Sequence, residues 1–107
     1  MKFLNLGDPN YYLPGFQRYL MDYKDIIIQN HSFIDTVDSL DQLQYFGDFY
    51  GLLNAMNLSP TLWWITLKIN GLEASHSFNE YLPNIFIPSE TYVKKRLDTY
   101  TRIFIKK

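Results

Sequence analysis

The sequence predicts one small α+β domain, in which a two-stranded antiparallel sheet packs on a hairpin of two helices. Three observations lead to this fold class. A chain of 107 residues with 47% hydrophobic and 20% charged residues suits one domain with a modest core. Ser59–Leu72 has the pattern of one short helix. Segments rich in β-branched residues lie well before and well after it, which gives the order strand, helix, helix, strand.

Residues 1–25 are expected to form an aromatic N-terminal arm. Gly7-Asp8-Pro9 and Pro14-Gly15 are turn signals, and Tyr11, Tyr12 and Phe16 lie between and after them. The spacing of Phe16, Tyr19, Leu20 and Tyr23 indicates a short helix. Its aromatic face would pack either on the domain or on a neighbouring protein, and the sequence leaves both open.

The first strand is expected at about residues 26–35, because Ile26-Ile27-Ile28 and Phe33-Ile34 favour extended structure. A polar stretch with several possible helix caps follows, and then a helical pattern. The residues expected to face inward from this first helix are Leu43, Phe46, Tyr50, Leu52, Leu53 and Met56. Asn57-Leu58 is a short connection, so this helix and the next should pack as a hairpin.

The second helix has a start signal, a periodic body and a stop signal. Ser59 is a suitable N-cap, Pro60 fits the first helical position, and Asn70-Gly71 can end the helix in a left-handed conformation. At 100° per residue the apolar stripe consists of Leu62, Ile65 and Ile69, is widened by Trp63 and Leu67, and lies opposite Trp64 and Lys68. Trp64 is therefore either part of a core that surrounds the helix or part of a partner surface together with Lys68.

After a loop at residues 73–81, the segment Ile85-Phe86-Ile87 between two prolines predicts a short second strand. Ser89 can cap a last helix that runs to about Tyr100. We thus expect a domain at residues 26–89 and a basic C-terminal extension at residues 90–107.

Charge is divided unevenly along the chain. Residues 1–93 hold ten Asp or Glu against four Lys or Arg, whereas residues 94–107 hold six Lys or Arg against one Asp. The extension, which is also apolar, matches an acidic, partly apolar groove on a neighbouring protein. Its expected contact residues are Tyr92, Lys94, Lys95, Arg96, Arg102 and Phe104. The alternative is that it folds back on the acidic body of its own domain.

No residue pattern points to catalysis, a cofactor or a metal. The chain has no cysteine, and its two histidines, His31 and His76, are expected to be solvated. Asp35, Asp38 and Asp41 fit helix capping better than a calcium loop, which would need a glycine and a final glutamate. We therefore expect a protein that is not an enzyme and has no small-molecule substrate.

The partner classes can also be narrowed. The acidic body and the lack of an aromatic–glycine RNA-binding motif favour protein partners over nucleic acid. No segment has the roughly 18 consecutive apolar residues of a membrane span, and the N-terminus has no signal-peptide pattern. The sequence therefore suggests a protein made and used in the cytosol. Nineteen aromatic residues, nine of them tyrosine, favour an assembly protein.

The order of these elements, together with two short motifs, resembles the LysM-like domain of baseplate wedge proteins from contractile-tail bacteriophages. The resemblance covers about residues 26–90, and it depends on the pairing of a Pro-x-Leu-Trp-Trp helix with a late Ile-Pro-Ser. The matching residues are Pro60, Leu62, Trp63, Trp64, Asn70, Gly71, Ile87, Pro88 and Ser89. The usual Tyr-Gly-Asp-Pro turn before the helix is replaced by Asn57-Leu58-Ser59-Pro60.

The resemblance implies a small βααβ LysM-like domain that acts as a structural part of the phage baseplate in the virion, after assembly in the host cytoplasm. Its partners would be other baseplate and tail subunits, such as wedge, sheath or tube proteins. LysM domains elsewhere bind peptidoglycan or chitin, so a sugar-binding module is the alternative. A regulatory domain that binds nucleic acid through the basic tail is a third interpretation.

Overall fold

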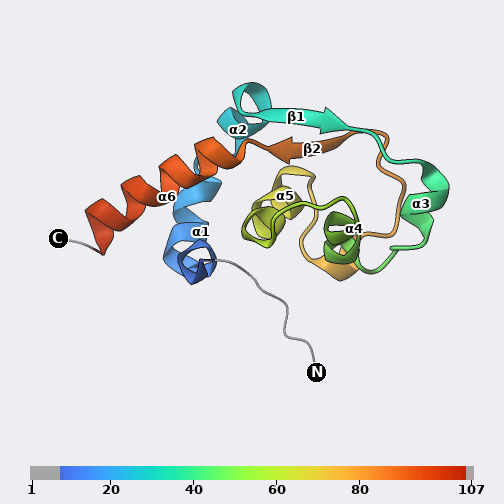
Figure 1. Cartoon of the computed structure of the whole chain (residues 1–107), viewed down its shortest axis with the longest axis horizontal. Coiled ribbons are helices and arrows are strands. Elements are labelled where there is room, and N and C mark those ends of the chain that lie inside the picture. The colour runs from blue at the N-terminus through green and yellow to red at the C-terminus, as the bar shows by residue number, and fades with distance from the viewer. Residues whose placement is uncertain (1–7, 106–107) are drawn as a thin grey trace.

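The computed structural model describes residues 8–105 of the chain. Within them, helices dominate and one small sheet is present (Figure 1). In chain order the elements are η1 (Pro9–Tyr12), α1 (Pro14–Met21), α2 (Lys24–Asn30), β1 (Ser32–Asp35), α3 (Ser39–Leu43), α4 (Phe49–Ala55), η2 (Pro60–Leu62), α5 (Trp63–Ile69), η3 (Ser75–Ser77), β2 (Ile85–Pro88) and α6 (Glu90–Phe104).

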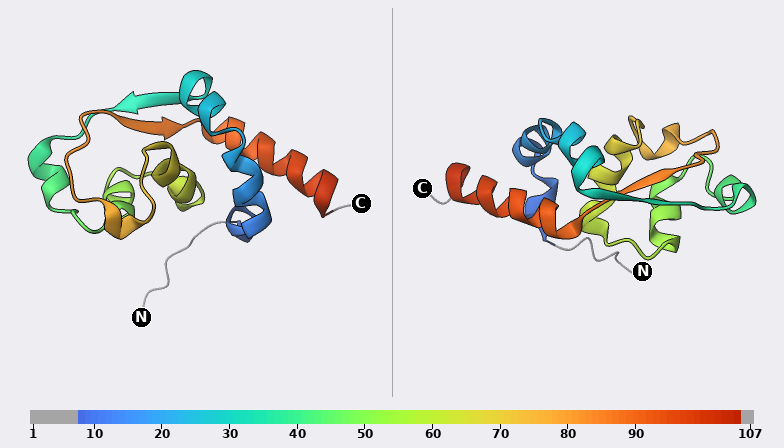
Figure 2. Two further views of the ribbon diagram at one scale, coloured as in Figure 1. Left: turned by 180° about the vertical axis from the view of Figure 1, so that it is seen from behind. Right: turned by 90° about the horizontal axis from the view of Figure 1, so that it is seen from above.

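The two strands pair antiparallel, with Phe33 opposite Ile87 and Ile34 opposite Phe86. The helices α4 and α5 lie below this sheet (Figure 1), and α6 and α3 lie at opposite ends of the molecule, as the two further views agree (Figure 2). The predicted α+β class with a two-stranded antiparallel sheet on a helix hairpin is confirmed.

The predicted first strand is wrong in its first half, where the chain forms helix α2. Ile27 is completely buried, whereas Ile26 on one side of it is exposed. The N–H of Ile27 donates to the Tyr23 carbonyl over 2.9 Å, as in a helix. The burial of Ile27 in this conformation outweighs the preference of isoleucine for extended structure. The strand begins only at Ser32.

The predicted first helix is divided into α3 and α4 by a turn at Gly47, which has φ of +86°. The N–H of Gly47 donates to the Phe78 carbonyl, and Asp48 caps α4 by accepting from the N–H of Gly51 over 3.0 Å. Leu52 and Leu53 are buried as predicted, and Tyr50 and Met56 are half-buried. Leu43 and Phe46 are exposed. They precede the break, so they are not on the same helix face as the buried residues of α4.

The second predicted helix is confirmed in position, and its stop signal is correct. Gly71 follows it with φ of +80°, a conformation that glycine adopts without steric cost. Its start differs from the prediction, since Pro60–Leu62 is a 3-10 turn that leads into α5. Ser59 does not cap it with its side chain, because its hydroxyl lies 3.0 Å from the Thr61 hydroxyl instead.

Helix α5 lies between two clusters of buried residues. Leu62, Ile65 and Ile69 belong to the first cluster, which otherwise comes from α1, α2 and α6: Phe16, Leu20, Ile27, Val93 and Leu97. Trp63 and Leu67 belong to the second, which otherwise comes from α4, β2 and the chain before β2: Phe49, Leu52, Leu53, Phe78, Ile85 and Ile87. The predicted apolar stripe thus packs in one part of the core, and the two residues that widen it pack in the other.

Both terminal segments contribute to the first cluster. Phe16 and Leu20 come from the predicted arm, and Val93 and Leu97 come from the predicted extension. Val93 and Leu97 thus pack on the predicted domain, which fits the alternative that the C-terminal segment folds back. Residues 1–7 of the arm and 106–107 of the extension lie outside the described residues.

We predict that Trp63→Ala and Leu67→Ala each lower the free energy of unfolding by about 2–5 kcal/mol, because each removes buried atoms and leaves a cavity. Urea denaturation followed by circular dichroism measures this. Leu40→Ala is the matched control, since Leu40 is 68% exposed; its effect should stay within about 0.5 kcal/mol. Equal effects at Leu67 and Leu40 would contradict the assignment of α5 to the core.

A chain stopped after Ser89 should fail to fold, because it loses Val93 and Leu97 and uncovers Phe16 and Leu20. The lost burial corresponds to roughly 4 kcal/mol or more, which is comparable to the stability of a small domain. Circular dichroism and thermal melting test this, with a chain stopped after Ile105 as the control. A cooperative melt close to that of the full chain would show that α6 is an independent attachment.

Candidate protein–protein interface

The residues predicted to contact partners fall into three groups: one near the N-terminus, one on α5 and one on α6. The structure places them differently with respect to solvent. Phe16 of the first group lies where α1 packs against α6, which carries the third group, and Trp64 of the second packs against the same cluster.

In the N-terminal group, Phe16 is only 1% exposed and so cannot act as a partner residue. Tyr11 is half-buried and meets the Phe16 ring edge-on at 6.2 Å between centroids. Tyr12 is also half-buried, and its hydroxyl donates a hydrogen bond to the Pro60 carbonyl. These rings attach η1 to the domain rather than to a neighbour. Burial raises the pKa of both tyrosines.

On α5, Trp64 is half-buried against the first cluster. The ammonium group of Lys68 lies 5.8 Å from the Trp64 ring centroid and donates to the Glu73 carbonyl over 2.8 Å. Trp64 therefore belongs partly to the core and still presents part of its ring to solvent.

The middle of α6 is occupied by contacts within the chain. The guanidinium carbon of Arg96 lies 4.9 Å from the Tyr23 ring centroid and 5.5 Å from that of Tyr92. The His31 ring stacks on Tyr92 at 3.8 Å between centroids and 11° between planes. His31 is thus half-buried against α6 rather than freely solvated, and Tyr92 and Arg96 tie α6 to the two ends of α2.

An aromatic cluster that the sequence analysis missed lies between α1 and the end of α6. The Tyr100 ring is 5.4 Å from Tyr19, 5.6 Å from Phe16 and 4.9 Å from Phe104. The spacings of Tyr19 from Tyr23 and of Tyr100 from Phe104, four residues in each case, were the available signal. A cavity of about 300 Å³ opens beside these rings and is also lined by Arg18 and Asp22.

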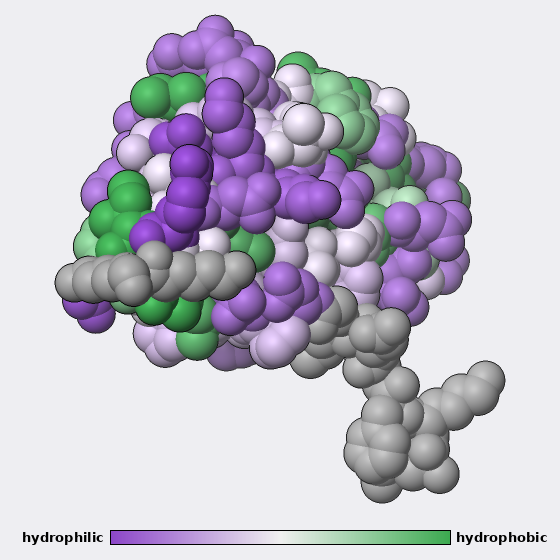
Figure 3. Space-filling model, turned by 60° about the vertical axis from the view of Figure 1, so that its left-hand side comes forward, coloured by the Kyte–Doolittle hydropathy of each residue, from purple (hydrophilic) through white to green (hydrophobic). Residues whose placement is uncertain are grey.

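The exposed side of α6 and its C-terminal end form the most accessible part of the predicted interface. Lys94, Lys95 and Arg102 are exposed, and three apolar side chains beyond them are about half exposed: Ile103, Phe104 and Ile105. Figure 3 brings this side forward and shows hydrophobic residues next to strongly hydrophilic ones. We call residues 94–105 the basic end of α6. Its combination of cations and apolar area is suited to an acidic, partly apolar protein surface.

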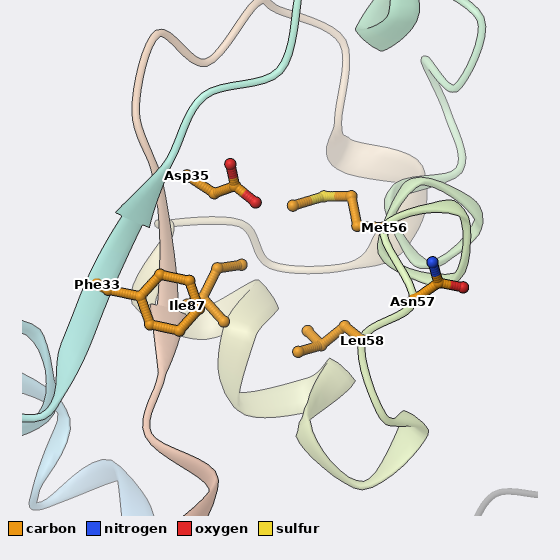
Figure 4. Close-up of a pocket in the computed structure, with 6 residues that line it drawn as sticks. All are labelled: Phe33, Asp35, Met56, Asn57, Leu58 and Ile87. Carbon is orange, nitrogen blue, oxygen red and sulfur yellow. The ribbon is translucent and has the colours of Figure 1, made fainter.

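A second cavity of about 210 Å³ lies between the sheet and the turn that joins α4 to η2 (Figure 4). Phe33, Asp35 and Ile87 line it from the sheet, and Met56 and Leu58 face them from the turn. Asn57, in that turn, has φ of +64°. Asp35 is the one acidic side chain of this lining, so the cavity combines apolar walls with a carboxylate.

Among residues 8–105, no cluster of three or more His, Asp or Glu could hold a metal ion. His76 is exposed, far in sequence from the stacked His31. No helix in the described part of the chain is long and apolar enough to cross a membrane.

Comparison with protein-family models, with curated proteins and with solved structures finds no match for this chain.

The unfolding free energy should fall as the pH rises above about 10, the ordinary pKa of tyrosine. Burial raises the pKa of Tyr11, Tyr12 and Tyr50, so above this pH the folded protein keeps protons that the unfolded chain has released. Urea titrations at about pH 9 and about pH 11 measure the fall. Tyr12→Phe should reduce it; an identical fall in this variant would contradict a role for Tyr12.

Proposed function

We propose that this protein is a structural subunit of a contractile-tail phage baseplate, a wedge component that joins neighbouring tail or baseplate proteins. The residues that resemble such proteins supply the identity of the assembly. The observation that carries a role in protein contacts is the basic end of α6, where Arg102 borders exposed Ile103, Phe104 and Ile105 and the exposed Lys94 and Lys95 lie on the same helix. Apolar area of this kind next to charge marks association surfaces.

The distribution of charge supports the same proposal. The chain from Asp25 to Leu67 contains five Asp and no Lys or Arg. The basic end of α6 lies at the end of the molecule opposite α3, which belongs to this acidic part (Figure 1). A bipolar subunit of this kind can join one neighbour with an acidic surface and another with a basic surface, and the two contacts do not compete.

The test uses virions of the phage that encodes this chain. Lys95→Glu and Ile103→Ser should reduce the amount of this protein in purified tails at least about tenfold, because each removes one element of the proposed contact. Lys24→Glu, which makes the same charge change on α2, is the matched control. All three isolated variants should melt close to wild type, since surface substitutions change stability by about 0.5 kcal/mol or less.

Two results would contradict the proposal. One is a normal amount of both variants in tails. The other is retention of the wild-type chain on insoluble peptidoglycan, which would support the sugar-binding alternative. A salt-dependent shift of DNA by the wild-type chain would instead favour the nucleic-acid interpretation.

A further inference from the structure

The two edges of the sheet differ in how their backbone groups are used. The N–H of Ser89 donates to the His31 carbonyl over 2.7 Å, which extends the register of Phe33 opposite Ile87. In an antiparallel pair, every second residue exchanges hydrogen bonds with its partner. Phe33 and Asp35 therefore direct their backbone groups toward β2, as does the carbonyl of His31, whose N–H donates to the Ile27 carbonyl instead. The N–H and C=O groups of Ser32 and Ile34 point to the outer edge of β1.

The outer edge of β2 is closed. The side-chain amide of Asn70 donates to the Phe86 carbonyl over 2.9 Å and its oxygen accepts from the Phe86 N–H over 2.9 Å. Pro88, the next residue that faces this edge, has no N–H to offer. Asn70 thus takes the place that a neighbouring strand would occupy.

The outer edge of β1 has no such cover in the described part of the chain. Among residues 8–105, β2 is the one strand paired with β1, and no segment runs along the outer side of β1 in the views of Figures 1 and 2. The side chains of Phe33 and Ile34 are 58% and 54% exposed. The strand interior has neither a proline nor a lysine, the residues that commonly protect an edge from further pairing.

We propose that the outer edge of β1 binds an extended segment of a partner protein, which pairs with Ser32 and Ile34 as a third strand. The segment carries a lysine or arginine beside Asp35 and an apolar residue beside Phe33. Main-chain hydrogen bonds supply the pairing, and the alternating side chains supply the specificity.

The charge of the surroundings selects a basic occupant. The five Asp and no Lys or Arg between Asp25 and Leu67 include Asp35 in the strand and Asp38 just after it. A second copy of this chain, paired through the same edge, would bring two such acidic regions together, and like charges opposite one another destabilise strand pairs. A basic segment from another protein has no such cost.

The cavity below the sheet accounts for the expected side-chain preference. A side chain on the inner face of an added strand would lie about 5 Å from its neighbour on β1. Phe33 and Asp35 are those neighbours, and both line the cavity of about 210 Å³ (Figure 4). The apolar stem of a lysine or arginine can contact Phe33 and Met56 while its charged head pairs with Asp35.

The first test measures binding of the peptide acetyl-Thr-Lys-Val-Val-Lys-Thr-amide to the full chain by NMR. The backbone amides of Ser32 and Ile34 should shift and gain protection from hydrogen exchange. The same peptide with Glu in place of both Lys should bind at least about tenfold more weakly, as should the wild-type peptide to Asp35→Lys. Shifts confined to residues outside β1, or equal binding of both peptides, would overturn the proposal.

The second test examines the backbone pairing. Ile34→Pro removes one outward N–H without touching a bond to β2 and should abolish binding, whereas Ile34→Thr should retain it. Two further peptides, one N-methylated at odd positions and the other at even positions, test the pairing on the wild-type protein. This test does not require Ile34→Pro to fold. One of the two peptides should bind and the other should not, because only alternate N–H groups face β1. Equal affinities of the two N-methylated peptides would refute the proposed strand pairing. Dimerisation of the chain through this edge, measured by ultracentrifugation, would refute it as well.

The edge of β1 would be a second contact of the proposed assembly subunit. This proposal rests on the proposed function only in that it requires neighbouring proteins. The peptide experiments use isolated components. Their failure would leave the contact at the basic end of α6 intact, and a failure of the tail assay would leave the binding of the peptide unchanged.

Discussion

The packing of α5 between two hydrophobic clusters is the constraint on which the rest of the structure depends. Ile65 and Ile69 hold α1, α2 and α6 on one side, and Trp63 and Leu67 hold α4 and β2 on the other. A seven-residue helix would be marginal alone in water, so its stability comes from this burial. Each terminal segment is in turn fixed because α5 offers it an apolar face.

Polar groups at the ends of α5 convert this packing into a defined orientation. The indole N–H of Trp63 donates to the Leu58 carbonyl over 2.9 Å, which fixes the turn after α4. At the other end Asn70 joins the Thr66 carbonyl and both backbone groups of Phe86. A partly buried amide with all these partners is costly to misplace, so it sets the position of β2 relative to the helix. It also leaves β1 as the edge open to pairing.

The proposed contact surfaces follow from the same arrangement. Helix α6 is held by Val93 and Leu97, and by the contacts of Tyr92 with His31 and Arg96. This packing leaves Lys94, Lys95 and Arg102 exposed. Helix α3 and the end of β1 that leads to it lie at the other end (Figure 1). Asp38 and Asp41 of the acidic segment are therefore far from the exposed cations of α6.

The sequence by itself determined the α+β class, the paired strands around a helix hairpin, and the position and stop of α5, because these depend on local periodicity, prolines and the left-handed Gly71. It also placed Lys94, Lys95 and Arg102 on an accessible surface. Only the tertiary structure decided that Ile26–Ile28 is helical and that Phe16 is core, since both depend on burial against α5 and α6, residues distant in sequence. That β1 carries the open edge could not be predicted either. The other edge of the sheet is closed by Asn70, which bonds to Phe86 of β2, 16 residues away in sequence.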